Sequence, residues 1–193
     1  MLTYYEIHLT VELNDNSIED FRRVCEIIDA KPIVINLKET KQVMTSKTVK
    51  SILNDVYEQA KQDVIVLEEN GFKVIRVKIE TNKIDIDTKY NYAEIHVLCH
   101  TRKLVEYPNI VNELLLFDSK GNQIKGHISH NEFKPNVTFI TWRSKLIEDF
   151  NYFNLVYKRL MKLGILTDLS EKPELEIIIC DSNQQLDSKW IDS

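Results

Sequence analysis

The chain has 193 residues, of which 43% are hydrophobic and 28% are charged, and its formal net charge is −5 at pH 7. This length fits one large domain or two small ones, and the apolar content is sufficient for a packed core. Contact with the phosphate backbone of duplex nucleic acid requires clustered Lys and Arg, and an acidic balance disfavours it. We therefore expect a globular protein that does not bind duplex nucleic acid.

The three cysteines, Cys25, Cys99 and Cys180, lie far apart in apolar segments. Their odd number and wide spacing disfavour a disulfide framework and a CxxC zinc site, and are typical of buried thiols in a reducing compartment. The first residues lack the basic-then-apolar pattern of a signal peptide, and no apolar run of about 18 residues predicts a membrane span. We expect a cytoplasmic protein without a membrane partner.

The common cofactor motifs are missing from the sequence, which has four glycines and no GxGxxG, Walker loop, HExxH or GxSxG. We therefore expect no P-loop, Rossmann or α/β-hydrolase chemistry, no cofactor and no metal. One alternative is a metal bound by His127, Ser129 and His130 together with Glu94 or Glu132. A His-x-x-His pair on a strand points to opposite faces, however, and this spacing is more typical of a loop or a strand edge.

The first predicted element is a half-buried strand from Tyr4 to Glu12, because apolar and polar residues alternate along it. Ser17 is a good N-cap for a helix with apolar residues at helical spacing, and Lys31-Pro32 ends that helix. Two β-rich segments follow, Ile33 to Leu37 and Gln42 to Ser46, and they indicate a hairpin.

A long helix is predicted from Thr48 to Glu69, followed by the stop signal Asn70-Gly71 and by a strand from Phe72 to Glu80. The resulting order, β-α-β-β-α-β, is that of a ferredoxin-like unit. The polar residues 83–90 then indicate a linker.

The pattern restarts after this linker. Tyr4-Tyr5-Glu6-Ile7-His8 recurs as Tyr92-Ala93-Glu94-Ile95-His96, at an offset of 96 − 8 = 88 residues. A helical stretch at 110–117, a hairpin at 126–131 and 137–142, a helix at 148–163 and a strand at 175–180 repeat the element order. The prediction is an α+β fold, a tandem duplication of a ferredoxin-like unit with mainly antiparallel sheets and helices on one face. The predicted parts are a first copy (1–82), a linker (83–90), a second copy (91–180) and a C-terminal tail that packs back through Trp190 (181–193).

The candidate site residues lie on the face of each first strand that points away from its helices. Glu6, His8 and Thr10 share that face in the first copy, and Glu94, His96, Leu98 and His100 share it in the second. Imidazole titrates near neutral pH, so two histidines can act as acid and base across a phosphodiester if the two open faces form one cleft. Further ligand-binding candidates, as cations or donors, are Arg76, Lys78, Arg143 and His127. The alternative is that each Glu-x-His pair is an ordinary cross-strand contact.

The segment His8-Leu9-Thr10-Val11 resembles the motif of the two-histidine phosphoesterases. Members of that family have two similar lobes, each with one such motif, and act on cyclic phosphates or 2′-5′ linkages. The resemblance implies that His8 and His96 are catalytic and that Thr10 supplies a hydroxyl. The second copy departs from the motif, because His96-Val97-Leu98-Cys99 lacks the hydroxyl.

Across nearly the whole chain the pattern also resembles one shared by uncharacterised proteins of bacteria and viruses, a family of duplicated ferredoxin-like proteins. It is carried by the two Tyr-x-Glu-x-His strands, Met44-Thr45-Ser46, Val77-Lys78-Ile79-Glu80, His127 to Asn131, and Asp181-Ser182-Asn183 with Leu186, Asp187 and Trp190. This resemblance implies no activity.

Two functional hypotheses follow from these observations. The first is a ligand-binding or phosphodiester-hydrolysing cleft between the copies, with His8, His96 and Thr10 as catalytic residues and a phosphate-bearing small molecule or nucleotide as ligand. The second is a non-catalytic interaction or regulatory module with a protein partner.

Overall fold

The computed structural model describes residues 2–13, 17–36, 41–83, 89–106, 116–118, 120–166 and 173–187. The chain divides into two units. Unit 1 comprises Met1–Ile35, Lys41–Asn91 and Ile177–Gln184, and unit 2 comprises Asn36–Thr40, Tyr92–Glu176 and Gln185–Ser193. The copy boundaries expected from the sequence stay predictions.

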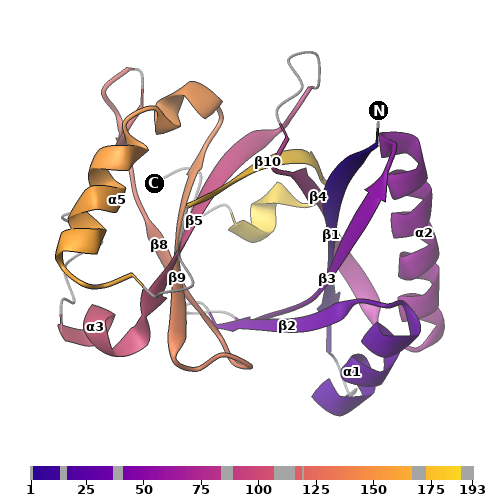
Figure 1. The fold of residues 1–193 in the computed structure, drawn as a ribbon. Coiled ribbons are helices and arrows are strands. Elements are labelled where there is room, and N and C mark those ends of the chain that lie inside the picture. Colours follow the sequence, from indigo (N-terminus) through magenta and orange to yellow (C-terminus); the bar gives the residue numbers. More distant parts are fainter. Residues whose placement is uncertain are drawn as a thin grey trace. The chain divides into compact units, whose positions relative to one another are not determined.

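Unit 1 is built around strand β1 (Thr3–Glu12), which pairs antiparallel with β3 (Lys41–Ser51) and with β4 (Lys73–Thr81). Unit 1 also contains α1 (Ile18–Ile27), β2 (Lys31–Asn36), α2 (Leu53–Glu69) and the larger part of β10 (Glu174–Asp181) (Figure 1). Helix α1 begins where expected, because the Ser17 hydroxyl accepts a hydrogen bond from the Asp20 amide at 3.1 Å. β3 is longer than predicted, and it takes up residues that the helical pattern had assigned to the long helix.

The core of unit 1 explains which face of β1 is left for polar side chains. Ile7 and Leu9 are fully buried, and they belong to one apolar cluster with Phe21 and Val24 of α1 and Val56 of α2. Burying one such side chain stabilises the fold by about 2 kcal/mol. Because successive side chains on a strand point to opposite faces, the residues between them face away from the helices.

Unit 2 has its own core, in which Trp142 packs edge-on against Phe153 with ring centroids 5.2 Å apart. Predicted helix residues 110–115 lie outside the described residues, whereas Leu116–Phe117 form a short strand. The elements of unit 2 are β5 (Tyr92–His100), α3 (Thr101–Glu106), β6 (Leu116–Phe117), β7 (Gln123–Ile124), β8 (His127–Asn131), β9 (Val137–Ser144), η1 (Ile147–Phe150) and α5 (Phe153–Lys162). Strand β10 (Glu174–Asp181) and the 3-10 turn η2 (Gln184–Asp187) follow, and Trp190 lies outside the described residues.

The sheet topology overturns the predicted fold class. The main described strands form a closed barrel in the order β1-β3-β2-β8-β9-β5-β10-β4, and β6 pairs with β7 in a separate small sheet. The prediction of tandem ferredoxin-like α+β units, each with its own sheet and helices on one face, is therefore wrong. The alternation of apolar and polar residues along a strand shows which residues face the helices. Whether a sheet closes into a barrel depends instead on which edge strands form hydrogen bonds with each other. Edge pairing leaves no local pattern in the sequence.

Among the described residues, no helix combines the length and apolar character that crossing a membrane would require.

Candidate functional site

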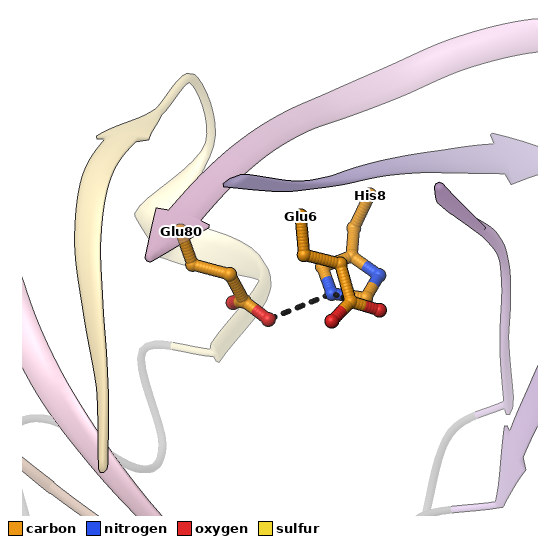
Figure 2. Close-up of side chains that lie close together, drawn as sticks. All are labelled: Glu6, His8 and Glu80. Carbon is orange, nitrogen blue, oxygen red and sulfur yellow. Dashed lines mark hydrogen bonds and ion pairs between the residues drawn. The ribbon is translucent and has the colours of Figure 1, made fainter. Parts of the chain in front are cut away.

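The first cluster of titratable side chains lies on the polar face of β1 and β4. Glu6 and His8 are two residues apart on β1, so they share a face, and Glu80 of β4 is the cross-strand partner of Glu6. One ligand-type atom from each of these three side chains lies within 4.8 Å of the other two. Figure 2 shows the Glu80 carboxylate and the His8 ring turned toward each other, with Glu6 beside them. We call these three residues triad 1.

The two ring nitrogens of His8 have different partners. Nδ1 donates to the main-chain carbonyl of Thr45 at 3.0 Å, and Nε2 lies 2.8 Å from Glu80 Oε1 and 3.6 Å from Glu6 Oε1. A carbonyl can only accept, so the Nδ1 hydrogen is committed to Thr45. A second proton must therefore lie between Nε2 and the Glu80 carboxylate, since both of these atoms would otherwise be acceptors.

The electrostatics agree with this second proton. Burial of the imidazole works against its charge, but the carboxylates of Glu80 and Glu6 together outweigh burial and raise the pKa of His8. Glu80 also accepts an ion pair from Lys78, with Nζ 2.6 Å from Oε2. In triad 1 and Lys78 together, two carboxylates are balanced by an imidazolium and an ammonium.

The accessibility of triad 1 is uneven. The Glu6 side chain is 35% exposed, compared with 11% for His8 and 3% for Glu80. The Ser46 hydroxyl donates to Glu6, and the Thr45 hydroxyl accepts from the Leu9 amide at 3.1 Å. Glu6 is therefore the member that a ligand in solution can reach most easily.

Two other predicted residues of unit 1 lie on the same strands. Thr10 is buried, with 2% of its surface exposed, two residues beyond His8 on β1. Arg76 of β4 donates to both carboxylate oxygens of Asp181, from Nε at 2.9 Å and from Nη2 at 2.6 Å. This bidentate pair is buried, so Arg76 orients the end of β10 in this structure.

Unit 2 contains a second cluster of the same composition, which we call triad 2. It consists of Glu94 and His96 of β5 and Glu176 of β10, again with ligand-type atoms within 4.8 Å of one another. His96 Nε2 lies 2.8 Å from Glu176 Oε2 and 3.1 Å from Glu94 Oε2, and Nδ1 lies 2.8 Å from the Thr141 hydroxyl.

The charge of His96 is also stabilised by its carboxylate neighbours. Burial works against the charged ring, but the carboxylates of Glu176 and Glu94 together raise the pKa of His96 to about 10. Arg143, the cross-strand partner of Glu94, forms an ion pair with it, and its guanidinium lies 5.0 Å from the centre of the Tyr92 ring. Triad 2 and Arg143 thus also balance two carboxylates with two cations.

His127 of β8, another predicted ligand-binding residue, lies beside this network by strand register. It is paired with Thr141 of β9, and Thr141 is in turn paired with His96 of β5. The three residues therefore occupy adjacent positions across three strands.

The structure brings each predicted Glu-x-His pair together with a carboxylate that the sequence reasoning missed. Glu80 and Glu176 come from strands that are distant in sequence, and neither was considered a site residue. A signal was available, because Glu80 and Glu176 differ by 96 positions, as do Thr45 and Thr141, which contact the two Nδ1 atoms. A shared offset among polar residues of different strands is typical of a repeated site.

No protein-family model and no curated protein matches the chain. A candidate monooxygenase from Fusobacterium nucleatum subsp. nucleatum has a TM-score of 0.35 and 8% identity over 93% of each chain. The ligand-free regulatory subunit of aspartate kinase from Thermus thermophilus has a TM-score of 0.33 and 14% identity, over 83% of this chain and 93% of that one. A dye-decolorizing protein from V. cholerae has a TM-score of 0.32 and 5% identity over 95% of each chain.

These similarities are too low to support an argument about the fold or the function of the chain. The resemblances to two-histidine phosphoesterases and to duplicated bacterial and viral proteins therefore stay predictions. So does a cleft shared by His8 and His96.

Proposed function

We propose that the protein binds a phosphate-bearing small molecule or nucleotide and cleaves a phosphodiester by acid–base chemistry at triad 1 and triad 2. One observation carries the proposal: the imidazole of His8 is held by a main-chain carbonyl at Nδ1 and shares a proton with a carboxylate at Nε2. A ring oriented in this way presents one nitrogen for proton transfer. His96 has the same kind of arrangement, with a hydroxyl at Nδ1.

Each side chain of triad 1 then has a role. The imidazolium of His8 donates its Nε2 proton to the leaving oxygen, and the more exposed Glu6 accepts a proton from the attacking water. Glu80 holds the imidazole in its charged form, while the ammonium of Lys78 offsets the negative charge that develops on the phosphate. In triad 2, Glu94, His96, Glu176 and Arg143 offer the same groups.

A specific observation favours the second candidate, a non-catalytic interaction or regulatory module. The cations Lys78, Arg76 and Arg143 all form ion pairs with buried carboxylates. The sole role of cations paired in this way can be to neutralise the buried carboxylates, without any contact with a ligand. In that case the histidines contribute to stability and not to turnover.

The experiment that separates the two candidates uses the full chain and bis(p-nitrophenyl) phosphate, followed by a panel of linear and cyclic nucleotides. We expect turnover that falls by 100-fold or more (on the order of a lost general acid) in His8→Ala and His96→Ala. His100→Ala is the matched control, because His100 is exposed on the same strand as His96. Loss of thermal stability in the two variants, with no turnover or nucleotide binding by the wild-type protein, would favour the non-catalytic module.

A cytoplasmic location is part of this proposal. Cys25, Cys99 and Cys180 are free thiols, and burial raises the pKa of Cys25 and of Cys99 to about 12. Thiols of this kind are inert and are compatible with a reducing compartment.

A further inference from the structure

We infer that each Glu-His-Glu triad is a divalent-metal site, with Glu6, His8 and Glu80 as ligands in unit 1 and Glu94, His96 and Glu176 in unit 2. The geometry is the first argument. Donor atoms about 2.1 Å from one ion lie roughly 3.0–3.4 Å from each other. The distances from histidine Nε2 to the carboxylate oxygens are 2.8 and 3.6 Å in triad 1 and 2.8 and 3.1 Å in triad 2. Shifts of a few tenths of an ångström would fit an ion.

The second argument is the orientation of the two imidazoles. A metal-binding histidine usually gives its other ring N–H to a carbonyl, carboxylate or water, which holds the ring toward the ion. His8 makes this contact through Nδ1 to the Thr45 carbonyl, and His96 makes a comparable one to the Thr141 hydroxyl. Nε2 is thereby left facing both carboxylates, as Figure 2 shows for His8.

The third argument is the repulsion between the two carboxylates of each triad, one of which is buried. Each triad places one almost fully buried carboxylate, Glu80 (2% exposed) or Glu94 (1% exposed), close to a less buried one, Glu6 or Glu176. Two negative charges so close together repel each other unless positive charge lies near them. In the absence of an ion, the proton on Nε2 supplies part of that charge. A divalent ion at the same position would supply more and would bind all three ligands directly.

The supporting contacts also resemble those around metal ligands. Ser46 donates to Glu6, Lys78 pairs with the Glu80 oxygen that faces away from His8, and Arg143 pairs with Glu94. Contacts of this kind hold ligating carboxylates in place. Both units contain the same set of ligand residues, and in each unit a basic side chain pairs with one ligand carboxylate.

The ligand set indicates the class of ion. One imidazole and two carboxylates suit Mn²⁺, Fe²⁺ or Zn²⁺ better than Ca²⁺, which takes six or more oxygens. Three protein ligands leave coordination positions for water or for an oxygen of a bound molecule. An ion bound to Nε2 would take the place of the Nε2 proton, so an ion-bound triad could not use its histidine as the general acid. Metal binding is therefore inferred independently of the proposed acid–base chemistry, although an ion would also reduce the repulsion between the carboxylates and a bound phosphate.

The test begins with full-length protein from which EDTA has removed any metal. The protein is titrated separately with Mn²⁺ and with Zn²⁺ by calorimetry, and elemental analysis gives the number of bound ions. We expect two ions per chain. Glu80→Gln and Glu176→Gln should each reduce the count to one, and the double variant should bind none. Glu58→Gln is the matched control, because Glu58 is exposed on α2 and pairs with Lys61 on the same helix, away from both triads.

Folding of each variant is checked by circular dichroism in EDTA. If Glu80→Gln does not fold, Glu6→Gln replaces it, because Glu6 is the most exposed ligand of triad 1. Absence of binding at millimolar metal, or full binding by the double variant, would overturn the inference. Metal binding without phosphodiester cleavage would instead refute the proposed function alone, and cleavage by the EDTA-treated protein without metal binding would refute this inference alone.

Discussion

At the scale of single residues, the feature that matters most is the pairing of a buried imidazole with two carboxylates. A histidine alone in such a place would lose its charge, because burial favours the neutral ring. In both triads the carboxylates reverse this effect, and the pKa of each histidine is raised. The charge state of the ring is therefore decided by residues that lie up to 80 positions away in the sequence, as 176 − 96 = 80 shows for triad 2.

A pH dependence of stability follows for His96. Its pKa is about 10 in the folded chain, above the ordinary value of 6.5, so folding favours the protonated ring. The stabilisation is complete below about pH 6.5 and is lost as the pH rises through about 10. For EDTA-treated protein, we expect the melting temperature of the wild type to fall more steeply than that of His96→Gln between pH 7 and 10 in thermal unfolding.

Lysines and tyrosines titrate in the same pH range, but they affect the melting temperatures of both proteins alike. The difference between the wild type and His96→Gln therefore reports on His96. A difference between the two melting curves that stays constant from pH 6 to pH 10 would show that His96 does not hold an extra proton in the folded state.

At the scale of elements, Gly126 lies directly before β8 and packs closely against side chains of β9. This close packing limits the size of the residue that position 126 can hold. Gly126 is buried, and a Cβ atom placed there would lie 2.8 Å from Trp142 Cε2 and 3.0 Å from Ile140 Cγ2. Trp142 is fully buried at the centre of the unit 2 core, so it cannot easily move away.

Gly126→Ala should therefore destabilise the protein by about 1–3 kcal/mol, the range typical of overpacking. Chemical denaturation measures this change, with Lys125→Ala as control because Lys125 is exposed and directly precedes Gly126. Equal stability of the two variants would mean that Trp142 can take up another rotamer at little cost.

At the scale of the whole molecule, metal binding at two sites should couple to folding. An ion that binds only the folded state stabilises it by about 2.7 kcal/mol per site when its free concentration is 100 times the Kd. Scanning calorimetry of the EDTA-treated protein with added Mn²⁺ should therefore show a higher melting temperature. The increase should be about halved in Glu80→Gln, and an unchanged melting temperature at saturating ion would contradict the prediction.

Much of the local structure could be predicted from the sequence. Strand β1 lies where the alternation from Tyr4 to Glu12 placed it, and α1 follows its Ser17 cap, because these patterns depend on neighbouring residues alone. The face of β1 that carries Glu6, His8 and Thr10 follows from the same alternation. By contrast, α3 was not expected, and β3 extends into residues with a helical pattern.

The sequence by itself therefore determined which side chains of a strand point to its polar face, since side chains alternate between the two faces with a period of two residues. Only the tertiary structure decided that the main strands close into one barrel, because closure depends on edge pairing between distant segments. It also decided which carboxylate meets each histidine. Glu80 reaches Nε2 of His8 through the register of β1 and β4, and Glu176 reaches Nε2 of His96 from β10, which is next to β5 in the strand order. Which strands are neighbours, and in which register, is set by the packing of the whole sheet.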